Sequence, residues 1–208
     1  MPSSTFFRLP EEKRHRLIDA CWGELTRVRF TDVSINRIIA AAHIPRGSFY
    51  QYFSDKEDLI RYLLEDLRQY FITLLRETLT EAKGDLFALP LIAYDRFISR
   101  QGHTDPMLTL FIRLMTLNKG MDFQSLIGGH ESFLPDPLWE VVDPSCLRRS
   151  DREYADQVFH LACAVLAFAI VETLEGSVQS PQVREKIKLR TDLLRYGGAA
   201  EGYKEEIA

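Results

Sequence analysis

The chain has 208 residues, of which 46% are hydrophobic and 27% are charged. This composition is that of a soluble globular protein and argues against long disordered stretches, and the length allows one large domain or two small ones. The net charge is −4, so the total charge does not itself point to a nucleic acid. A docking face needs only local positive charge, however, and residues 8–53 carry eight Lys and Arg against five Asp and Glu.

The cysteine residues argue against a disulfide framework and against a zinc site. Cys21, Cys146 and Cys163 are odd in number and widely spaced. His160, Cys163 and Glu172 would share one helix, but no matching pair of ligands lies nearby in the sequence. We therefore predict reduced thiols in a cytoplasmic protein, with no metal and no cofactor.

The sequence shows no signal for secretion or membrane insertion. The first residues lack an apolar stretch followed by a cleavage site. The longest uninterrupted apolar run covers residues 161–171, whereas a membrane-spanning helix needs about 20 residues. We predict that this run is a helix buried inside a protein that does not contact a membrane.

Helical periodicity dominates the chain and hairpin signals are scarce, so the predicted fold class is all-α. The apolar positions predict helices at 11–28, 34–42, 45–52, 55–82, 85–100, 105–118, 120–128, 151–176 and 181–196. The longest of these begins after Ser54, which together with Glu57 fits a capping box. We predict an N-terminal domain over 1–54 and a C-terminal helical domain over 55–208, joined by the shared helix 55–82.

Two short predicted helices, 34–42 and 45–52, follow a longer one and are separated by a tight turn at His43. This is the pattern of a three-helix unit with a helix-turn-helix, whose second short helix enters the major groove of duplex DNA. Phe49 and Phe53 fall where they would hold that second helix against the core.

The start of the second short helix has the residues that a groove-reading helix needs. Gly47 would let the backbone approach DNA closely, and Ser48 is a short donor beside it. Arg46 could pair bidentately with guanine or, alternatively, contact a phosphate. Tyr50 and Tyr52 carry hydroxyl groups that could reach phosphates, although packing is an alternative role for each ring.

Further phosphate contacts are expected around this helix. The start of helix 34–42 at Ser34 offers free N–H groups and the positive end of a helix dipole. Thr31 and Arg37 lie close to that start in the sequence. Lys56 begins the next helix, where a cation opposes the dipole, so a phosphate partner is a better explanation for it than a structural role.

The run Gly-Ser-Phe-Tyr-x-Tyr-Phe-x-x-Lys-Glu, at 47–57, resembles the N-terminal signature of the TetR family of transcription repressors. The resemblance covers about residues 10–65. It implies a DNA-binding function with contacts from Thr31, Ser34, Arg37, Pro45, Arg46, Gly47, Ser48, Tyr50, Gln51, Tyr52 and Lys56.

Two residues depart from the family pattern. His43 stands where the family often has glycine, and we expect it to adopt the left-handed conformation that ends a helix. Pro45 stands where serine is common, so the recognition helix should lack a side-chain cap. Neither change argues against the fold, but both could alter DNA contacts.

The resemblance also implies a homodimer, because two recognition helices must match two half-sites on one duplex. The family dimerises through its last two long helices, here 151–176 and 181–196, and residues 162–169 alternate small and large side chains. The expected interface residues are Ala162, Val165, Ala169 and Leu193. A purely intramolecular core role for these helices is the alternative.

The resemblance further implies that the C-terminal domain encloses a small effector, which the aromatic content suggests is apolar or aromatic. The candidate pocket residues are Tyr94, Phe97, Met107, Phe111, Met115, Trp139, Phe159 and Phe168, each of which could instead be plain core. The expected mechanism is a repressor released from a near-palindromic operator when the effector changes the angle of helix 55–82.

The sequence also bears on two other classes of function. An enzyme is disfavoured because the sequence has no Gly-rich phosphate loop, no nucleophile elbow and no HExxH motif. A protein-interaction module with a vestigial helix-turn-helix would give no reason for Arg46, Gly47 and Tyr50 to coincide on one short helix.

Overall fold

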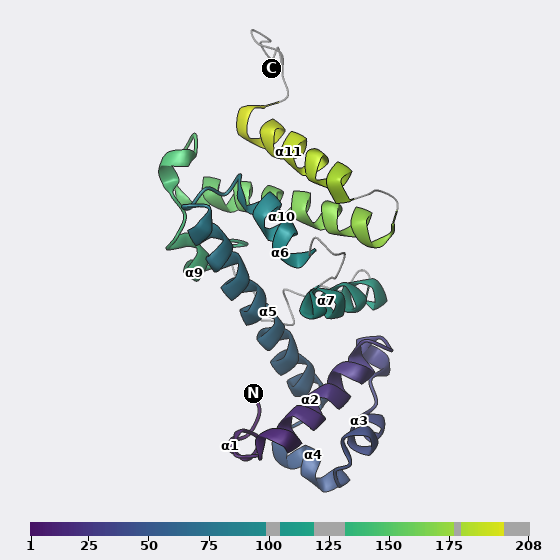
Figure 1. Cartoon of the computed structure of the whole chain (residues 1–208). Coiled ribbons are helices and arrows are strands. Elements are labelled where there is room, and N and C mark those ends of the chain that lie inside the picture. The colour runs from purple at the N-terminus through teal and green to yellow at the C-terminus, as the bar shows by residue number, and fades with distance from the viewer. Residues whose placement is uncertain (99–104, 119–131, 177–179, 198–208) are drawn as a thin grey trace, which may run out of the picture. The chain divides into compact units, whose positions relative to one another are not determined.

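The computed structural model describes residues 1–98, 105–118, 132–176 and 180–197, and within these ranges the fold is helical (Figure 1). In chain order the elements are α1 (Ser4–Phe7), α2 (Glu11–Leu25), η1 (Phe30–Asp32), α3 (Ile35–Ala42), α4 (Arg46–Tyr52), α5 (Lys56–Glu81), α6 (Leu89–Phe97), α7 (Pro106–Leu117), α9 (Asp136–Trp139), η2 (Pro144–Cys146), α10 (Arg152–Leu174) and α11 (Ser180–Tyr196). The all-α prediction is confirmed. The helix expected at 120–128 lies outside the described residues.

The chain divides into two compact units, and α5 contributes to both. Unit 1 consists of Met1–Tyr70 with Thr104–His130, and unit 2 consists of Phe71–His103 with Glu131–Ala208. This division differs from the expected domains 1–54 and 55–208. The reason is packing, because the first half of α5 supplies buried leucines to unit 1 and α7 is part of the same unit.

Unit 1 is built around the contact between α2 and α3. Each of its longer helices contributes at least one buried apolar side chain to the core. Examples are Leu17, Ile38, Phe49 and Leu63. The predicted periodicity of 11–28 and 34–42 is therefore realised on the expected helices. The short elements α1 and η1 were not predicted, because three or four residues are too few to show a period.

The cap of α5 lies one residue later than predicted. The carboxylate of Asp55 accepts a hydrogen bond from the backbone N–H of Asp58 at 2.6 Å, so Asp55 is the N-cap. Asp58 in turn accepts from the backbone N–H of Ser54 at 3.2 Å. The capping box predicted for Ser54 and Glu57 is not formed: Asp55 caps the helix, and the buried carboxylate of Asp58 is satisfied by Ser54, the residue before the cap.

Unit 2 packs α10 against α6 and α11 around a core that includes Leu79, Leu86, Leu138 and Phe159. The chain turns after α5 at Gly84, which has a φ of +81°. A Cβ on this residue would lie 2.4 Å from the backbone nitrogen of Asp143, so only glycine fits the turn.

One face of α10 is buried and the opposite face is exposed. Ala162, Val165 and Ala169 lie on the buried face, so the expectation that they form an intersubunit surface is wrong. Small side chains on α10 serve close packing inside unit 2. The large apolar residues that are exposed are Leu161, Phe168, Val171 and Leu174 on α10 and Leu189, Leu193 and Tyr196 on α11.

By length and composition alone α10 could cross a membrane, since its most apolar window has a mean hydropathy of 1.8. The buried core helices of soluble proteins meet the same criterion. Its buried residues pack inside unit 2, but Leu161, Phe168 and Val171 are exposed, so the run 161–171 is only partly buried and the prediction of a buried helix holds for one of its faces alone.

The eight residues expected to line an effector pocket do not share one environment. Tyr94, Phe97 and Phe159 are buried in unit 2, where the hydroxyl of Tyr94 lies 2.7 Å from that of Thr173. Trp139 packs against the same core from its edge. Phe168 is 64% exposed, so the structure contradicts its assignment to an enclosed pocket. The other three residues lie on α7 in unit 1, and they are Met107, Phe111 and Met115.

Candidate nucleic-acid interface

The turn between α3 and α4 has the geometry that its sequence predicts. His43 adopts the left-handed conformation, with φ 53° and ψ 47°, and ends α3. The backbone N–H of Ile44 donates to the carbonyl of Ile39 at 3.0 Å, which closes the end of the helix. Pro45 then begins α4 at φ −63° without a side-chain cap, as expected.

α4 places its apolar residues inward and its polar residues outward. Phe49 and, just beyond the helix end, Phe53 are buried, which confirms that they hold the helix against the core. Arg46 and Gly47 are exposed and Ser48 is half-buried. Pro45, Tyr50 and Gln51 are also exposed, whereas Tyr52 is half-buried beside the ring of Phe6.

The packing around position 47 does not require a glycine there. A Cβ built on it would meet no atom within 4 Å, and its φ is not positive. Glycine inside a helix costs about 1 kcal/mol relative to alanine. A glycine that the protein's own packing does not require suits a surface that another molecule approaches closely.

Arg46 is oriented by a neighbour on the other short helix. Its guanidinium donates to the side-chain oxygen of Asn36 at 2.8 Å, and both residues are exposed. This contact links the exposed sides of α3 and α4. Asn36 is not among the predicted DNA contacts, although its position two residues after Ser34 on an amphipathic helix places it next to the expected surface.

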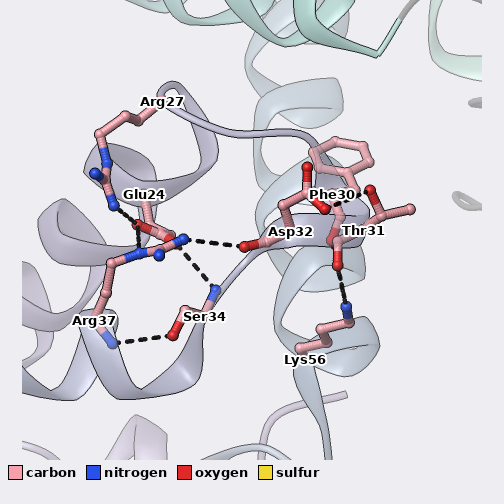
Figure 2. Close-up of polar contacts among 8 residues, drawn as sticks. All are labelled: Glu24, Arg27, Phe30, Thr31, Asp32, Ser34, Arg37 and Lys56. Atoms are coloured by element: carbon pink, nitrogen blue, oxygen red, sulfur yellow. Dashed lines mark hydrogen bonds and ion pairs between the residues drawn. The ribbon is translucent and has the colours of Figure 1, made fainter.

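Glu24 on α2 organises the start of α3 (Figure 2). Only 5% of this residue is exposed, and its carboxylate accepts hydrogen bonds from Arg37 at 2.8 Å and from Arg27 at 2.7 Å. It also accepts from the backbone N–H of Ser34 at 3.0 Å. Burial alone would raise the pKa of Glu24, but these donors outweigh it and lower the pKa to about 2.

Arg37 therefore has a different partner from the one predicted. It pairs with Glu24 and also donates to the backbone carbonyl of Asp32 at 3.1 Å. A buried carboxylate requires a compensating cation, which fixes the guanidinium near α2. The residue is nevertheless exposed. A phosphate contact from Arg37 stays a prediction, and its role in holding α3 to α2 is the observed one.

Lys56 is likewise engaged inside unit 1. Its ammonium donates to the carbonyl of Thr31 at 3.0 Å and reaches that of Phe30 at 3.5 Å, so it closes the end of η1 (Figure 2). These carbonyl acceptors lie 25 and 26 residues away in the chain, so the sequence near Lys56 gives no sign of its structural role. Thr31 itself is exposed, and its hydroxyl contacts Asp32 at 3.3 Å.

Ser34 caps α3 as predicted, since its hydroxyl accepts from the backbone N–H of Arg37 at 3.4 Å. Just before this cap, η1 is held from a second side by α7. The buried side chain of Asn118 accepts from the backbone N–H of Phe30 at 3.0 Å. No sequence signal pointed to Asn118, because the pair is 88 residues apart.

Comparisons with known proteins agree on this region. Residues 17–63 match the model of the family described as bacterial regulatory proteins, tetR family. A stretch of 59 residues is 41% identical to the transcriptional regulator AcuR of Cereibacter sphaeroides. That match covers 28% of this chain and 27% of AcuR, so the similarity to this relative concerns about a quarter of each protein.

One solved structure is similar over nearly the whole chain. It is a TetR family transcriptional regulator from Chloroflexus aurantiacus J-10-fl, with 28% sequence identity and a TM-score of 0.52. The match covers 95% of this chain and 98% of the other. The likeness therefore extends beyond the helix-turn-helix into the helices that follow it.

Proposed function

We propose that this chain is a TetR-family transcriptional regulator and acts as a homodimeric repressor of a near-palindromic operator, since its residues 17–63 match that family's model and a TetR family regulator of known structure is similar over 95% of the chain. A small lipophilic or aromatic effector, bound by the helices after α4, releases it from the DNA. The protein acts in the cytoplasm on duplex DNA. The observation that carries the proposal is the outward face of α4, where Arg46 is exposed beside a glycine that the fold does not need.

In the proposed complex the start of α4 enters the major groove. Arg46 reads a base edge, and its contact with Asn36 keeps the guanidinium extended along the exposed side of α3. The exposed residue Tyr50 and the N-terminal turn of α3 at Ser34 face phosphates. The Glu24 cluster contributes indirectly, because it fixes where α3 begins.

The homodimer is formed through the exposed apolar residues of α10 and α11. On α11, Leu189, Leu193 and Tyr196 follow the spacing i, i+4, i+7, so they share one face of the helix. On α10, Phe168 is 64% exposed. Apolar stripes on two neighbouring helices suit a second copy of the same helices, since family members typically dimerise. Of the interface residues expected from sequence, Leu193 alone is kept.

The effector acts on DNA binding through η1. Lys56 on α5 and Asn118 after α7 both hold this short element, which directly precedes the cap of α3 at Ser34. A shift of α5 or α7 would change the position of η1 and so the start of α3. An effector that binds the shifted form more tightly weakens operator binding by that difference in affinity.

The test is selection of binding sites by the wild-type protein from a library of random duplexes. We expect a near-palindromic sequence with half-sites about one helical turn apart. Replacement Arg46→Ala should cost about 1–3 kcal/mol on the selected site and relax the preference at one base position in each half-site. If the wild-type protein enriches no sequence and binds all duplexes alike in gel shifts with competitor, the proposed function is wrong.

The effector is sought separately. A thermal-shift screen of small lipophilic and aromatic compounds against the full chain should identify binders, since a ligand raises the melting temperature of the state it binds. A true effector also lowers affinity for the selected operator at the concentration that stabilises the protein. A compound that stabilises the chain without changing operator affinity is not the effector.

A further inference from the structure

The N-terminal helix α1 contacts α4, the proposed recognition helix, and lies outside residues 17–63 that match the family (Figure 1). Its anchor is Phe6, which is fully buried. The ring of Phe6 lies 5.1 Å from that of Phe53, just after α4, and 5.3 Å from that of Tyr62 on α5. One side chain of α1 therefore joins the end of α4 to α5.

Ser3 stands at the N-cap position of α1 but does not cap its own helix. Its backbone N–H donates to the carbonyl of Tyr52 at 2.9 Å, and its hydroxyl donates to the carbonyl of Gln51. Both acceptors belong to the last turn of α4. Ser3 thus supplies a cap to another helix, across 48 and 49 residues of sequence.

α4 needs this support because it is short. Seven residues form about two turns, and an isolated helix of that length is unstable in water. Its first turn has no side-chain cap, since Pro45 holds the N-cap position. The carbonyls of its last turn have no partner within the helix, so donors from elsewhere must satisfy them.

We propose that Ser3 and Phe6 are positioning residues for DNA reading, which hold the far end of α4 so that Arg46 and Gly47 meet the base edges at a fixed angle. The inference rests on the proposed function. It assigns sequence-specific recognition to a segment before the family-matched region. Loss of this brace tilts α4 and removes base contacts, while phosphate contacts elsewhere on unit 1 persist.

The experiment uses the full chain and the operator selected by the wild-type protein. Ser3→Pro removes both donors, and proline fits the φ of −69° that Ser3 already has. Ser4→Pro is the matched control, because Ser4 is the first exposed residue of α1, a position that accepts proline. Ser3→Thr keeps both donors and should restore wild-type behaviour. Phe6→Leu tests the second anchor while keeping an apolar side chain in place.

Affinity is measured for the selected operator and for an unrelated duplex, beside the melting temperature of each variant. We expect Ser3→Pro and Phe6→Leu to weaken operator binding about tenfold, with affinity for the unrelated duplex within about twofold of wild type. Ser4→Pro and Ser3→Thr should match wild type on both.

Three results would overturn the inference while leaving the proposed function intact. The first is unchanged operator affinity in Ser3→Pro and Phe6→Leu. The second is an equal loss on both duplexes that follows the fraction unfolded, which assigns the brace to stability alone. The third is an equal loss in Ser4→Pro. If the wild-type protein selects no operator at all, the proposed function itself fails.

Discussion

Units 1 and 2 each have exposed residues on their described helices, and the two exposed surfaces have opposite chemistry. On α4 the exposed residues are polar or lack a side chain, as in Arg46 and Gly47. On α10 and α11 they are large and apolar, as in Phe168 and Leu189, which are 64% and 63% exposed. A helix without an outside partner would bury large apolar side chains such as Phe168 and Leu189. Such a helix would also have no use for a glycine at position 47.

The difference indicates two kinds of partner. On α4, hydrogen-bond donors lie beside Gly47, which has no side chain. This arrangement suits duplex DNA, whose base edges must be approached closely to be read. Apolar side chains at helical spacing suit a second copy of the same helices. The supports also differ, because α4 buries only Phe49 of its own residues and is held further by Ser3 and Phe6 of another segment, whereas α10 is held by its own buried face.

The largest expected effect tests the apolar surface. Phe168→Asp combined with Leu189→Asp places two charges per chain where we propose that subunits meet, so the dimer should dissociate to monomers. Two linked recognition units bind far more tightly than one, so operator affinity should fall by about 100-fold or more. Sedimentation equilibrium gives the mass, and gel shifts give the affinity.

Thr80→Asp is the control for charge, since Thr80 is an exposed polar residue of α5 in the same unit. It should leave both the mass and the affinity unchanged. A double variant that stays dimeric and binds the operator normally would show that α10 and α11 do not form the interface.

A second prediction concerns the support under the polar surface. Glu24→Gln removes the charge that pairs with Arg27 and Arg37 in a nearly buried position, and it should destabilise the protein by about 2–3 kcal/mol at neutral pH. The matched control is Glu12→Gln, whose carboxylate is 89% exposed and 3.8 Å from Arg16. An exposed ion pair of this kind contributes about 0.5 kcal/mol or less.

The pH dependence of this effect has a definite sign. The folded-state pKa of Glu24 is about 2, below its ordinary value of 4.5. Its contribution to stability is therefore complete above about pH 4.5 and is lost as the pH falls toward 2. The gap in urea stability between wild type and Glu24→Gln should narrow between pH 5 and pH 3, in the range set by these pKa values. If the difference in urea stability were equal at the two ends of this pH range, the charge of Glu24 would not be what stabilises the contact between α2 and α3.

Sequence pattern predicts the long helices, because α2, α5 and α11 show a repeating apolar stripe and α10 contains an apolar run of 11 residues, too long for an ordinary strand. It also located the turn at His43 and the outward residues of α4, since both follow from local backbone and side-chain chemistry. Elements of three or four residues, such as α1 and η1, show no period and were missed.

What the sequence could not show depends on pairs that are distant in the chain. Arg37 and Lys56 were expected to face DNA, but their partners Glu24 and Thr31 become neighbours only in the fold. The error on α10 has a related cause. Small residues permit close packing against any neighbour, so the pattern at 162–169 could not distinguish the inner face from a surface between subunits.

The last prediction separates stability from recognition at two glycines that share one property. A Cβ on Gly47 or on Gly23 would meet no atom of the chain within 4 Å, and neither has a positive φ. Alanine at either position should therefore stabilise its helix by up to about 1 kcal/mol. Gly23 lies in the last turn of α2, on a different helix from the exposed start of α4, so Gly23→Ala should raise the melting temperature and leave operator affinity unchanged.

Gly47→Ala should raise the melting temperature too, yet weaken operator binding about tenfold, because a methyl group would hold the backbone off the base edges by more than a hydrogen bond tolerates. If one variant is more stable but binds the operator more weakly, the weaker binding cannot come from damage to the fold. Equal operator affinity in Gly47→Ala and Gly23→Ala would show that DNA does not approach α4 at this residue, and the glycine would then need another explanation.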